Sequence, residues 1–340
     1  MTSEFKSDRI LLDHGSGGAM SHELIAKMML PAFENPVLAQ LDDGAVLEID
    51  GVRLAFSTDT YVVDPIFFPG GSIGDLAVNG TVNDLAMCGA VPLYLSVGMI
   101  IEEGFACRDL EKILADMAHA ARRAGVAVVA GDTKVVPHGA ADKVFINTSG
   151  IGSVAHGVRV SGDGARPGDA VILSGSIADH GVTVLIQREG MVFEADVRSD
   201  SAPLNHLVAR MFDAGGSIRV LRDPTRGGVA TTLNEIAKQS GVGIAIDENR
   251  IPVKASVAGI CELLGVDPLY VANEGKLLAF VDPADAELVL AAMRKDPLGK
   301  DAVIIGTATA QDAGRVVLKT RIGGSRIVDM LSGEQLPRIC

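Results

Sequence analysis

The sequence has 340 residues, which is long enough for about two domains. Apolar residues make up 48% of it, and 43 acidic residues outnumber 30 basic ones, so that the net charge is −13. This composition is typical of a soluble globular protein, and its negative charge argues against nucleic acid and anionic membrane surfaces as partners.

The first part of the chain predicts an α+β layer in which helices cover one face of a sheet. Asp50 and Gly51 separate two apolar segments and indicate a hairpin. We expect, in chain order, a short strand running into a glycine-rich loop over 10–18, a helix over 19–33, strands over 45–49 and 52–58, a helix over 73–88, a strand over 92–101, a helix over 108–124, a buried strand over 126–130 and a strand over 144–154.

The turn-rich segment 162–169 is the best domain boundary, and a second α/β unit follows it. We expect strands over 170–174, 243–246, 276–281, 302–308 and 311–320, and helices over 180–189, 204–212, 228–239, 253–264 and 283–295. From residue 321 the periodicity is lost. The expected division is therefore a domain over 1–160, a second over 161–320 and a flexible, largely irregular tail over 321–340.

Aspartates recur where predicted strands end or helices begin. Each could be a turn or helix-capping residue. Together they indicate a site for Mg²⁺, which prefers carboxylate oxygens, phosphates and water as ligands. The candidate metal ligands are Asp43, Asp59, Asp84, Asp132 and Asp223.

The predicted helix over 73–88 carries a second polar pattern. Asp75, Asn79 and Asn83 recur every four residues and so share one stripe, which we interpret as part of a binding surface; a polar face on an ordinary surface helix is the alternative. The sequence lacks Gly-x-x-x-x-Gly-Lys-Ser/Thr and lacks Gly-x-Gly-x-x-Gly after a strand, so a P-loop and a Rossmann dinucleotide site are not indicated.

The sequence has four cysteines, and they are neither paired as Cys-x-x-Cys nor arranged in a zinc-finger spacing. Sparse cysteine and a polar first segment without a signal peptide predict a cytoplasmic protein. Cys340 is the last residue printed, and such a thiol can be presented to another site. A frayed tail is the alternative. Cys88, Cys107 and Cys261 fit core or helix-face positions.

Ordered motifs of the chain resemble the aminoimidazole ribonucleotide synthetase-like ATPases, which bind Mg-ATP without a P-loop. This resemblance covers nearly the whole chain and implies two α/β domains, with the N-terminal sheets of two subunits joined in a barrel-like dimer core. The motifs are Asp-Asp-Gly-Ala, Ser-Thr-Asp, Gly-Asp-Leu-Ala-Val-Asn with Val-Asn-Asp-Leu-Ala-x-x-Gly-Ala, Ala-Gly-Asp-Thr and Arg-Asp-Pro-Thr-Arg-Gly-Gly.

Three further features resemble the HypE family of hydrogenase maturation proteins: Asp-His-Gly-Ser-Gly-Gly, Gly-Asp-Thr-Lys-Val-Val and the terminal Pro-Arg-Ile-Cys. By this resemblance a carbamoyltransferase, HypF, loads a carboxamide onto Cys340. The chain then uses ATP to dehydrate the carboxamide to a thiocyanate, and the cyano group passes to iron on a HypC–HypD complex. The expected activity is an ATP-dependent carbamoyl dehydratase of [NiFe] hydrogenase maturation.

The same resemblance assigns candidate roles to further residues. Lys134 and Glu274 are the expected residues of proton removal, and His14 could approach the site from the glycine-rich loop. Gly131 and Thr133, on either side of Asp132, are expected to contact the nucleotide.

Two other readings remain open at this point. The chain could be a selenophosphate synthetase or a thiamine-monophosphate kinase, whose acceptors are diffusible and need no terminal cysteine. It could also be a thiol carrier that docks a partner without turning over ATP.

Overall fold

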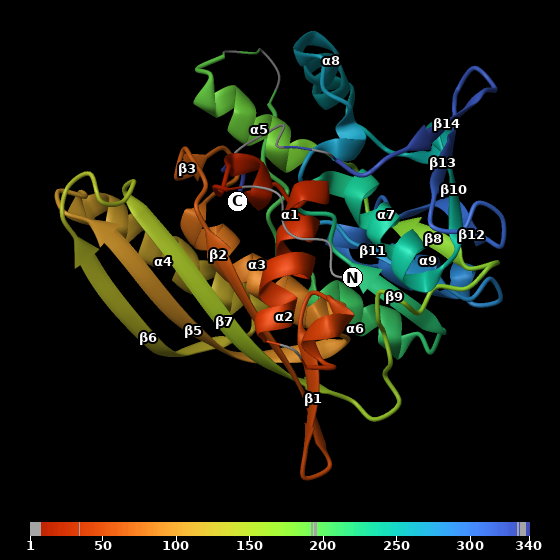
Figure 1. Cartoon of the computed structure of the whole chain (residues 1–340), viewed down its shortest axis with the longest axis horizontal. Helices are drawn as coiled ribbons and strands as arrows, with labels where there is room; N and C mark the ends of the chain where they lie inside the picture. The colour runs from red at the N-terminus through yellow and green to blue at the C-terminus, as the bar shows by residue number, and fades with distance from the viewer. Residues whose placement is uncertain (1–7, 34, 192, 194–195, 332, 334–337) are drawn as a thin grey trace.

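The computed structural model of the chain describes residues 8–33, 35–191, 193, 196–331, 333 and 338–340. This part of the chain forms a five-stranded sheet, a seven-stranded sheet and a ladder of two short strands. The five-stranded sheet lies in the first half of the chain and the seven-stranded sheet in the second, and the C-terminus lies between the two halves in Figure 1. None of the described helices is long and apolar enough to cross a membrane.

The first sheet has the strand order β1-β2-β7-β5-β6. Its pairs are antiparallel except β5 with β6, which is parallel. The strands are β1 (Ala45–Ile49), β2 (Val52–Tyr61), β5 (Ala90–Glu102), β6 (Ala127–Val136) and β7 (Val144–Val154). The predicted hairpin is confirmed, with Asp50 and Gly51 at positive φ in its turn.

Two helices, α3 (Ile73–Met87) and α4 (Cys107–Ala124), pack together and confirm two of the three helices predicted for this half. Side chains alternate along the strands, so one face of the sheet enters the apolar core with these helices. The opposite face is open, and Phe56, Ile151 and Tyr94 form a row of exposed side chains across three neighbouring strands on it.

The second sheet has the order β14-β13-β10-β12-β8-β11-β9. Its strands are β8 (Ala170–Leu173), β9 (Ile218–Arg222), β10 (Gly243–Asp247), β11 (Leu278–Val281), β12 (Val303–Thr309), β13 (Val316–Lys319) and β14 (Ser325–Val328). The helices of this half are α5 (Asp179–Arg188), α6 (Asn205–Asp213), α7 (Gly228–Ser240), α8 (Ala255–Leu264) and α9 (Ala286–Met293). Alternate strand residues contact α7 on one face and α6 with α9 on the other.

Two strands of this sheet are absent from the sequence prediction. β9 is a short segment before Asp223, and β14 pairs with β13. The expectation of an irregular arm from residue 321 is therefore wrong for Ser325–Val328, because this segment completes the edge of the sheet. Residues 332 and 334–337 of the predicted tail lie outside the described residues.

The N-terminal segment also differs from its prediction. The expected strand is a 3₁₀ helix at Leu12–Gly15, because Nδ1 of His14 accepts a hydrogen bond from the Leu11 amide and closes the turn. The expected helix over 19–33 is confirmed as α1 (Ala19–Leu24), a π-helical turn (Ile25–Met29) and α2 (Leu30–Ala32).

The predicted buried strand over 126–130 is longer than expected and is exposed. It forms β6 at the edge of the first sheet, and nearly all its residues face solvent in the single chain. A two-residue ladder, β3 (Phe67–Phe68) with β4 (Gly71–Ser72), precedes α3 and was not predicted.

Candidate active site

Three of the predicted aspartates meet between the two halves of the chain. Asp43 precedes β1, Asp84 lies on α3 and Asp223 directly follows β9. The hydroxyl of Ser57 on β2 joins two of them, since it contacts a carboxylate oxygen of Asp84 at 2.7 Å and the backbone oxygen of Asp43 at 3.0 Å. The charge of Asp223 acts on both of these carboxyl groups, so segments from both halves of the chain form one acidic site.

Burial, together with repulsion between neighbouring carboxylates, raises the pKa of the carboxyl groups in this site. Burial is the main cause for Asp43 and Asp84, and neighbouring carboxylates add to it; the Arg222 guanidinium opposes the rise at Asp43. Burial and the charge of Asp59 raise the pKa of Asp223 to about 6, against the effect of Arg222.

Glu274 lies in the loop before β11 and is buried beside this site. Burial raises its pKa, and the charges of Asp223 and Asp59 add to the effect. One of its carboxyl oxygens, Oε1, is buried without a hydrogen-bond partner among the described residues. Asp200 fixes the loop, because it accepts the Glu274 amide at 3.2 Å and lies 3.0 Å from Nζ of Lys276. Glu274 therefore has the surroundings of a buried general base.

Arg226 connects this acidic site to the end of the chain. The charge of Cys340 is the largest of the effects that raise the pKa of Arg226, and Asp59 and Glu274 act in the same direction. This arginine belongs to the motif Arg-Asp-Pro-Thr-Arg-Gly-Gly, and no role was predicted for it. Its place three residues after Asp223, a predicted metal ligand, is the signal that could have identified it.

The last residues of the chain are docked in this region. Ile339 and Cys340 are buried in the core cluster of the first half of the chain. The segment pairs with the end of β2 in the manner of a strand: the Val62 amide donates to the Cys340 oxygen at 3.0 Å, and the Asp64 amide donates to the Arg338 oxygen at 3.2 Å.

Side chains from both halves hold this docked segment. His180 on α5 is fully buried, and its Nε2 lies 2.8 Å from the Ile339 oxygen while its Nδ1 lies 2.8 Å from the Ser199 hydroxyl. Nε2 therefore carries the proton that is donated to Ile339, since a carbonyl oxygen only accepts. Burial lowers the pKa of His180, which favours the neutral ring. Arg188 donates to the Arg338 oxygen at 2.7 Å, and Arg338 pairs with Asp142.

The Asp132 motif lies elsewhere in the single chain. Asp132 and Lys134 are exposed on the edge strand β6 and pair with one another at 2.7 Å. The contacts that lower the pKa of Asp132 come from Lys134 and the Thr133 amide, within the same strand. Gly131 faces the backbone of Val97 on β5, where a Cβ would crowd the carbonyl oxygen. One chain does not bring these residues to the acidic site.

The polar stripe of α3 has partners within the protein. Asp75 accepts the Ser72 amide at 2.9 Å and so completes a capping box with Ser72, the N-cap residue of the helix. Asn79 donates to the Ser201 hydroxyl at 3.0 Å, and Asn83 binds both the Ala202 oxygen and the Leu204 amide. These two asparagines hold a loop of the second domain against α3.

The glycine-rich loop approaches the site through its backbone. Gly17 has φ of +73°, and a Cβ there would lie 3.0 Å from the Cβ of Arg226. A Cβ at Gly18 would overlap the carbonyl oxygen of Leu331. His14 is buried within the loop, and its Nδ1 is engaged by the Leu11 amide. Of the other cysteines, Cys88 and Cys261 are buried and Cys107 is exposed at the start of α4, in agreement with the expected core or helix-face positions.

The acidic site fits a divalent cation that is shared with a nucleotide. Oδ2 of Asp43 is buried without a hydrogen-bond partner in the described part of the chain, and its neighbours Asp84 and Asp223 are acidic. No group of three acidic, histidine or cysteine side chains forms a ready-made metal cage among the described residues. Mg²⁺ is commonly held by one or two carboxylates, substrate phosphates and water, so this donor set suits it.

The family models that match the chain describe AIR synthase-related proteins. The model of the N-terminal domain matches residues 41–154 and that of the C-terminal domain matches residues 166–319. Among curated relatives, "Carbamoyl dehydratase HypE" of Rhizobium leguminosarum bv. viciae is 57% identical over 98% of this chain and 95% of its own length. The protein of the same name from Escherichia coli K12 is 46% identical over 98% of this chain and 100% of its own length.

Solved structures give the same result. A structure of hydrogenase maturation protein HypE in complex with ATP is 55% identical, covers 98% of this chain and 100% of that one, and superposes with a TM-score of 0.83. A HypE–HypF complex has a TM-score of 0.87 at 50% identity over 91% of this chain and 99% of that one. A ThiL complexed with AMPPCP and TMP has a TM-score of 0.71 at 22% identity, over 92% of this chain and 96% of that one, a likeness of fold alone.

Proposed function

The chain belongs to the AIR synthase-related family and, within it, to the HypE carbamoyl dehydratases, and from this membership we propose how its residues act. The proposed reaction is the ATP-dependent dehydration of a carboxamide on the sulfur of Cys340 to a thiocyanate. The product supplies the cyanide ligand of the iron in [NiFe] hydrogenase.

The observation that carries this proposal is the docked C-terminus. Cys340 is buried, and its backbone oxygen accepts a hydrogen bond from the Val62 amide. The charges of Cys340 and Glu274 both raise the pKa of Arg226. A thiol that merely terminates a chain needs none of these contacts. An enzyme with a diffusible acceptor, such as a thiamine-monophosphate kinase, would not require these contacts of the C-terminus.

The chemistry requires a better leaving group than the carboxamide oxygen. In the first step this oxygen attacks the γ-phosphorus of ATP, ADP leaves, and one N–H proton is lost to a base. In the second step the remaining N–H proton is removed, the C–O bond breaks, and inorganic phosphate leaves as the C≡N bond forms. The sum is carboxamide plus ATP giving thiocyanate, ADP, phosphate and one proton.

Glu274 is the proposed base for an N–H proton, since it is buried near the docked end and has a raised pKa. Arg226 is placed to stabilise negative charge that develops on the phosphorylated oxygen. The buried surroundings of Ile339 and Cys340 exclude water, which would otherwise hydrolyse the intermediate.

We assign the divalent cation to Asp43, Asp84 and Asp223, with Asp59 at the margin of the same site. When bound, Mg²⁺ would neutralise the phosphates of ATP and the charge that forms during phosphoryl transfer. These carboxylates would hold the cation, and the nucleotide would supply further oxygen ligands.

In this proposal Lys134 and Asp132 are brought to the active site of the neighbouring subunit in a homodimer. The open face of the first sheet carries the exposed row Phe56, Ile151 and Tyr94, and β6 is an unpaired edge strand. Exposed apolar rows and free edges of this kind favour association. In the resulting two-fold dimer, with the two sheets joined in a barrel-like core, the partner subunit's Lys134 would supply the second proton-accepting group.

The proposed partners follow from the reaction. HypF is the carbamoyltransferase that loads Cys340, and a relative is solved as a HypE–HypF complex. A HypC–HypD complex would accept the cyano group. For loading and delivery the C-terminal tail has to leave the docked position, so the proposal includes a flexible tail. A cytoplasmic location is a separate part of the proposal.

Intact-mass spectrometry tests the proposal directly. The protein is incubated with HypF, carbamoyl phosphate and ATP, and the modified residue is located by peptide mapping. The proposal predicts a carbamoyl adduct on Cys340 that loses one water in the presence of Mg-ATP. An adduct that stays hydrated, or one located on Cys88, Cys107 or Cys261, would contradict it.

A further inference from the structure

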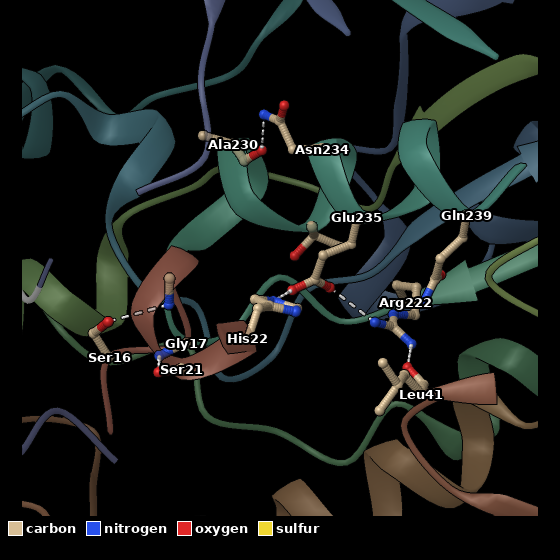
Figure 2. Close-up of polar contacts among 12 residues, drawn as sticks. Ser16, Gly17, Ser21, His22, Leu41, Arg222, Ala230, Asn234, Glu235 and Gln239 are labelled. Carbon is tan, nitrogen blue, oxygen red and sulfur yellow. Dashed lines mark hydrogen bonds and ion pairs between the residues drawn. The ribbon is translucent and has the colours of Figure 1, made fainter. Parts of the chain in front are cut away.

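A continuous set of polar contacts connects the N-terminal helix to the acidic site, and Figure 2 shows the part of it that runs from His22 to Arg222. Nε2 of His22 on α1 lies 2.7 Å from Oε1 of Glu235 on α7. The other oxygen of Glu235, Oε2, lies 2.8 Å from Nη2 of Arg222. Nε of Arg222 lies 3.3 Å from Oδ1 of Asp43.

The middle of this set is buried and charged. The Arg222 side chain is 8% exposed and faces the carboxylates of Asp42, Asp43 and Glu235. In such surroundings the orientation of a guanidinium depends on which carboxylates remain in place. The contacts of His22 and Arg222 outweigh the burial of Glu235 and hold its pKa below the ordinary value, so Glu235 remains ionised.

Arg222 orients Asp43 from two directions. It contacts Oδ1 of Asp43, and its Nη1 donates to the oxygen of Leu41 in the segment that leads to Asp43. The other oxygen of Asp43, Oδ2, is buried and lacks a hydrogen-bond partner in the described part of the chain. The arginine therefore takes one oxygen of the carboxylate and leaves the second available to a cation.

We propose that His22 is a positioning residue for Asp43, acting through Glu235 and Arg222, so that docking of α1 onto α7 aligns the carboxylate that binds the divalent cation. This inference rests on the proposed function, which assigns Asp43 to that cation. Because Nε2 faces a carboxylate, which only accepts, it carries the proton in this contact.

Contacts other than that of His22 also hold α1 in place. The helix is also held where the Ala19 amide donates to the Leu331 oxygen at 2.8 Å and where Gly17 packs on Arg226. The side chain of His22 is 37% exposed, so its replacement leaves no buried cavity. Loss of His22 should therefore leave α1 docked and disturb mainly Glu235 and the residues beyond it.

The test compares three variants of the full chain by the binding of Mn²⁺ in the presence of a non-hydrolysable ATP analogue, followed by electron paramagnetic resonance. His22→Ala removes the contact, and His22→Gln restores an N–H donor at a similar position. Lys27→Ala is the matched control, because Lys27 pairs with Glu23 inside the same helical segment.

We expect His22→Ala to weaken Mn²⁺ binding about threefold to tenfold, as for the loss of one charge-assisted hydrogen bond. His22→Gln should recover most of the affinity, and Lys27→Ala should bind like the unmodified chain. The thermal unfolding midpoint of His22→Ala should stay near that of Lys27→Ala. A purely structural contact predicts the reverse pattern, with a lower midpoint and unchanged Mn²⁺ affinity, and that result would overturn the inference. Failure of the unmodified chain to bind Mn²⁺ would instead overturn the proposed metal site, and this inference with it.

Discussion

The amide of Val62 donates a hydrogen bond of 3.0 Å to the oxygen of Cys340, and so the end of the chain is bound to the end of β2. Two residues along, Asp64 repeats this contact with Arg338. The reacting sulfur is thereby placed by backbone pairing, which is independent of the group that the sulfur carries. The same docking can serve the free thiol, the carboxamide and the thiocyanate.

Replacement of His180 should loosen the docked end. His180→Ala removes the donor to the Ile339 oxygen and a buried ring that contacts Phe68 edge-on. The loss of one buried hydrogen bond is worth about 1 kcal/mol, so the docked population should fall several-fold. We expect faster reaction of Cys340 with a thiol reagent and slower dehydration in a single turnover. His156→Ala, at an exposed histidine, is the control, and equal thiol reactivity in both variants would show that His180 does not hold the tail.

Glu274→Gln should stop the reaction after loading. The substitution keeps the shape of the side chain and removes its capacity to accept a proton. Loss of a general base slows a reaction by about 10²–10⁴-fold, so the carbamoyl adduct on Cys340 should accumulate. Quantitative mass spectrometry of the adduct measures this effect, and Glu262→Gln on the exposed side of α8 is the matched control. Dehydration at the normal rate in Glu274→Gln would remove Glu274 from the mechanism.

The metal-free protein should lose stability as the pH rises through about 6, because burial and Asp59 raise the pKa of Asp223 to about 6. A carboxyl group with a raised pKa stabilises the fold while it is protonated, so its contribution is complete below about pH 4 and is lost above the folded-state value. Two pKa units correspond to about 3 kcal/mol for this group.

Urea unfolding in the presence of a chelator, at pH values on either side of this range, measures the effect. The free energy of unfolding of Asp223→Asn should depend less on pH than that of the unmodified protein. Asp301→Asn, at an exposed position, should show the same pH dependence as the unmodified protein. Identical pH dependence in Asp223→Asn and the unmodified protein would mean that Asp223 does not titrate in this way.

The open face of the first sheet should mediate the dimer. Ile151 is 40% exposed between Phe56 and Tyr94, so Ile151→Glu would introduce a charge into the proposed interface without entering the core of the single chain. We expect the variant to be monomeric by size-exclusion chromatography with light scattering, and to lose dehydration. Ile322→Glu, at a residue that is 96% exposed in the second half, should stay dimeric. A dimeric and active Ile151→Glu variant would contradict the proposed interface.

Much of the fold was predictable because its signals are local. The hairpin at Asp50 and Gly51 and the amphipathic helix α4 follow from turn chemistry and apolar periodicity. Asp43, Asp84 and Asp223 could be selected because each stands at a strand end or on a helix beside one. β14 and the exposure of β6 could not be predicted, since both depend on which strand lies next to which.

The contacts of polar side chains were the least predictable feature. Asn79 and Asn83 have the spacing of a binding stripe, yet their partners are residues of a loop more than a hundred positions away. His180 and Arg188 have no local pattern that relates them to the C-terminus. Sequence spacing shows which side chains share a face, whereas the tertiary fold decides what that face meets.

An oxygen-18 label tests the central claim most directly, because the claim is that the carboxamide oxygen of Cys340 leaves as phosphate. The protein is loaded with a carboxamide that carries oxygen-18 and is mixed with unlabelled Mg-ATP, and the inorganic phosphate is analysed by mass spectrometry. The account predicts one labelled oxygen in each phosphate released together with thiocyanate formation. Thiocyanate formed with unlabelled phosphate, and with the label in water, would contradict it.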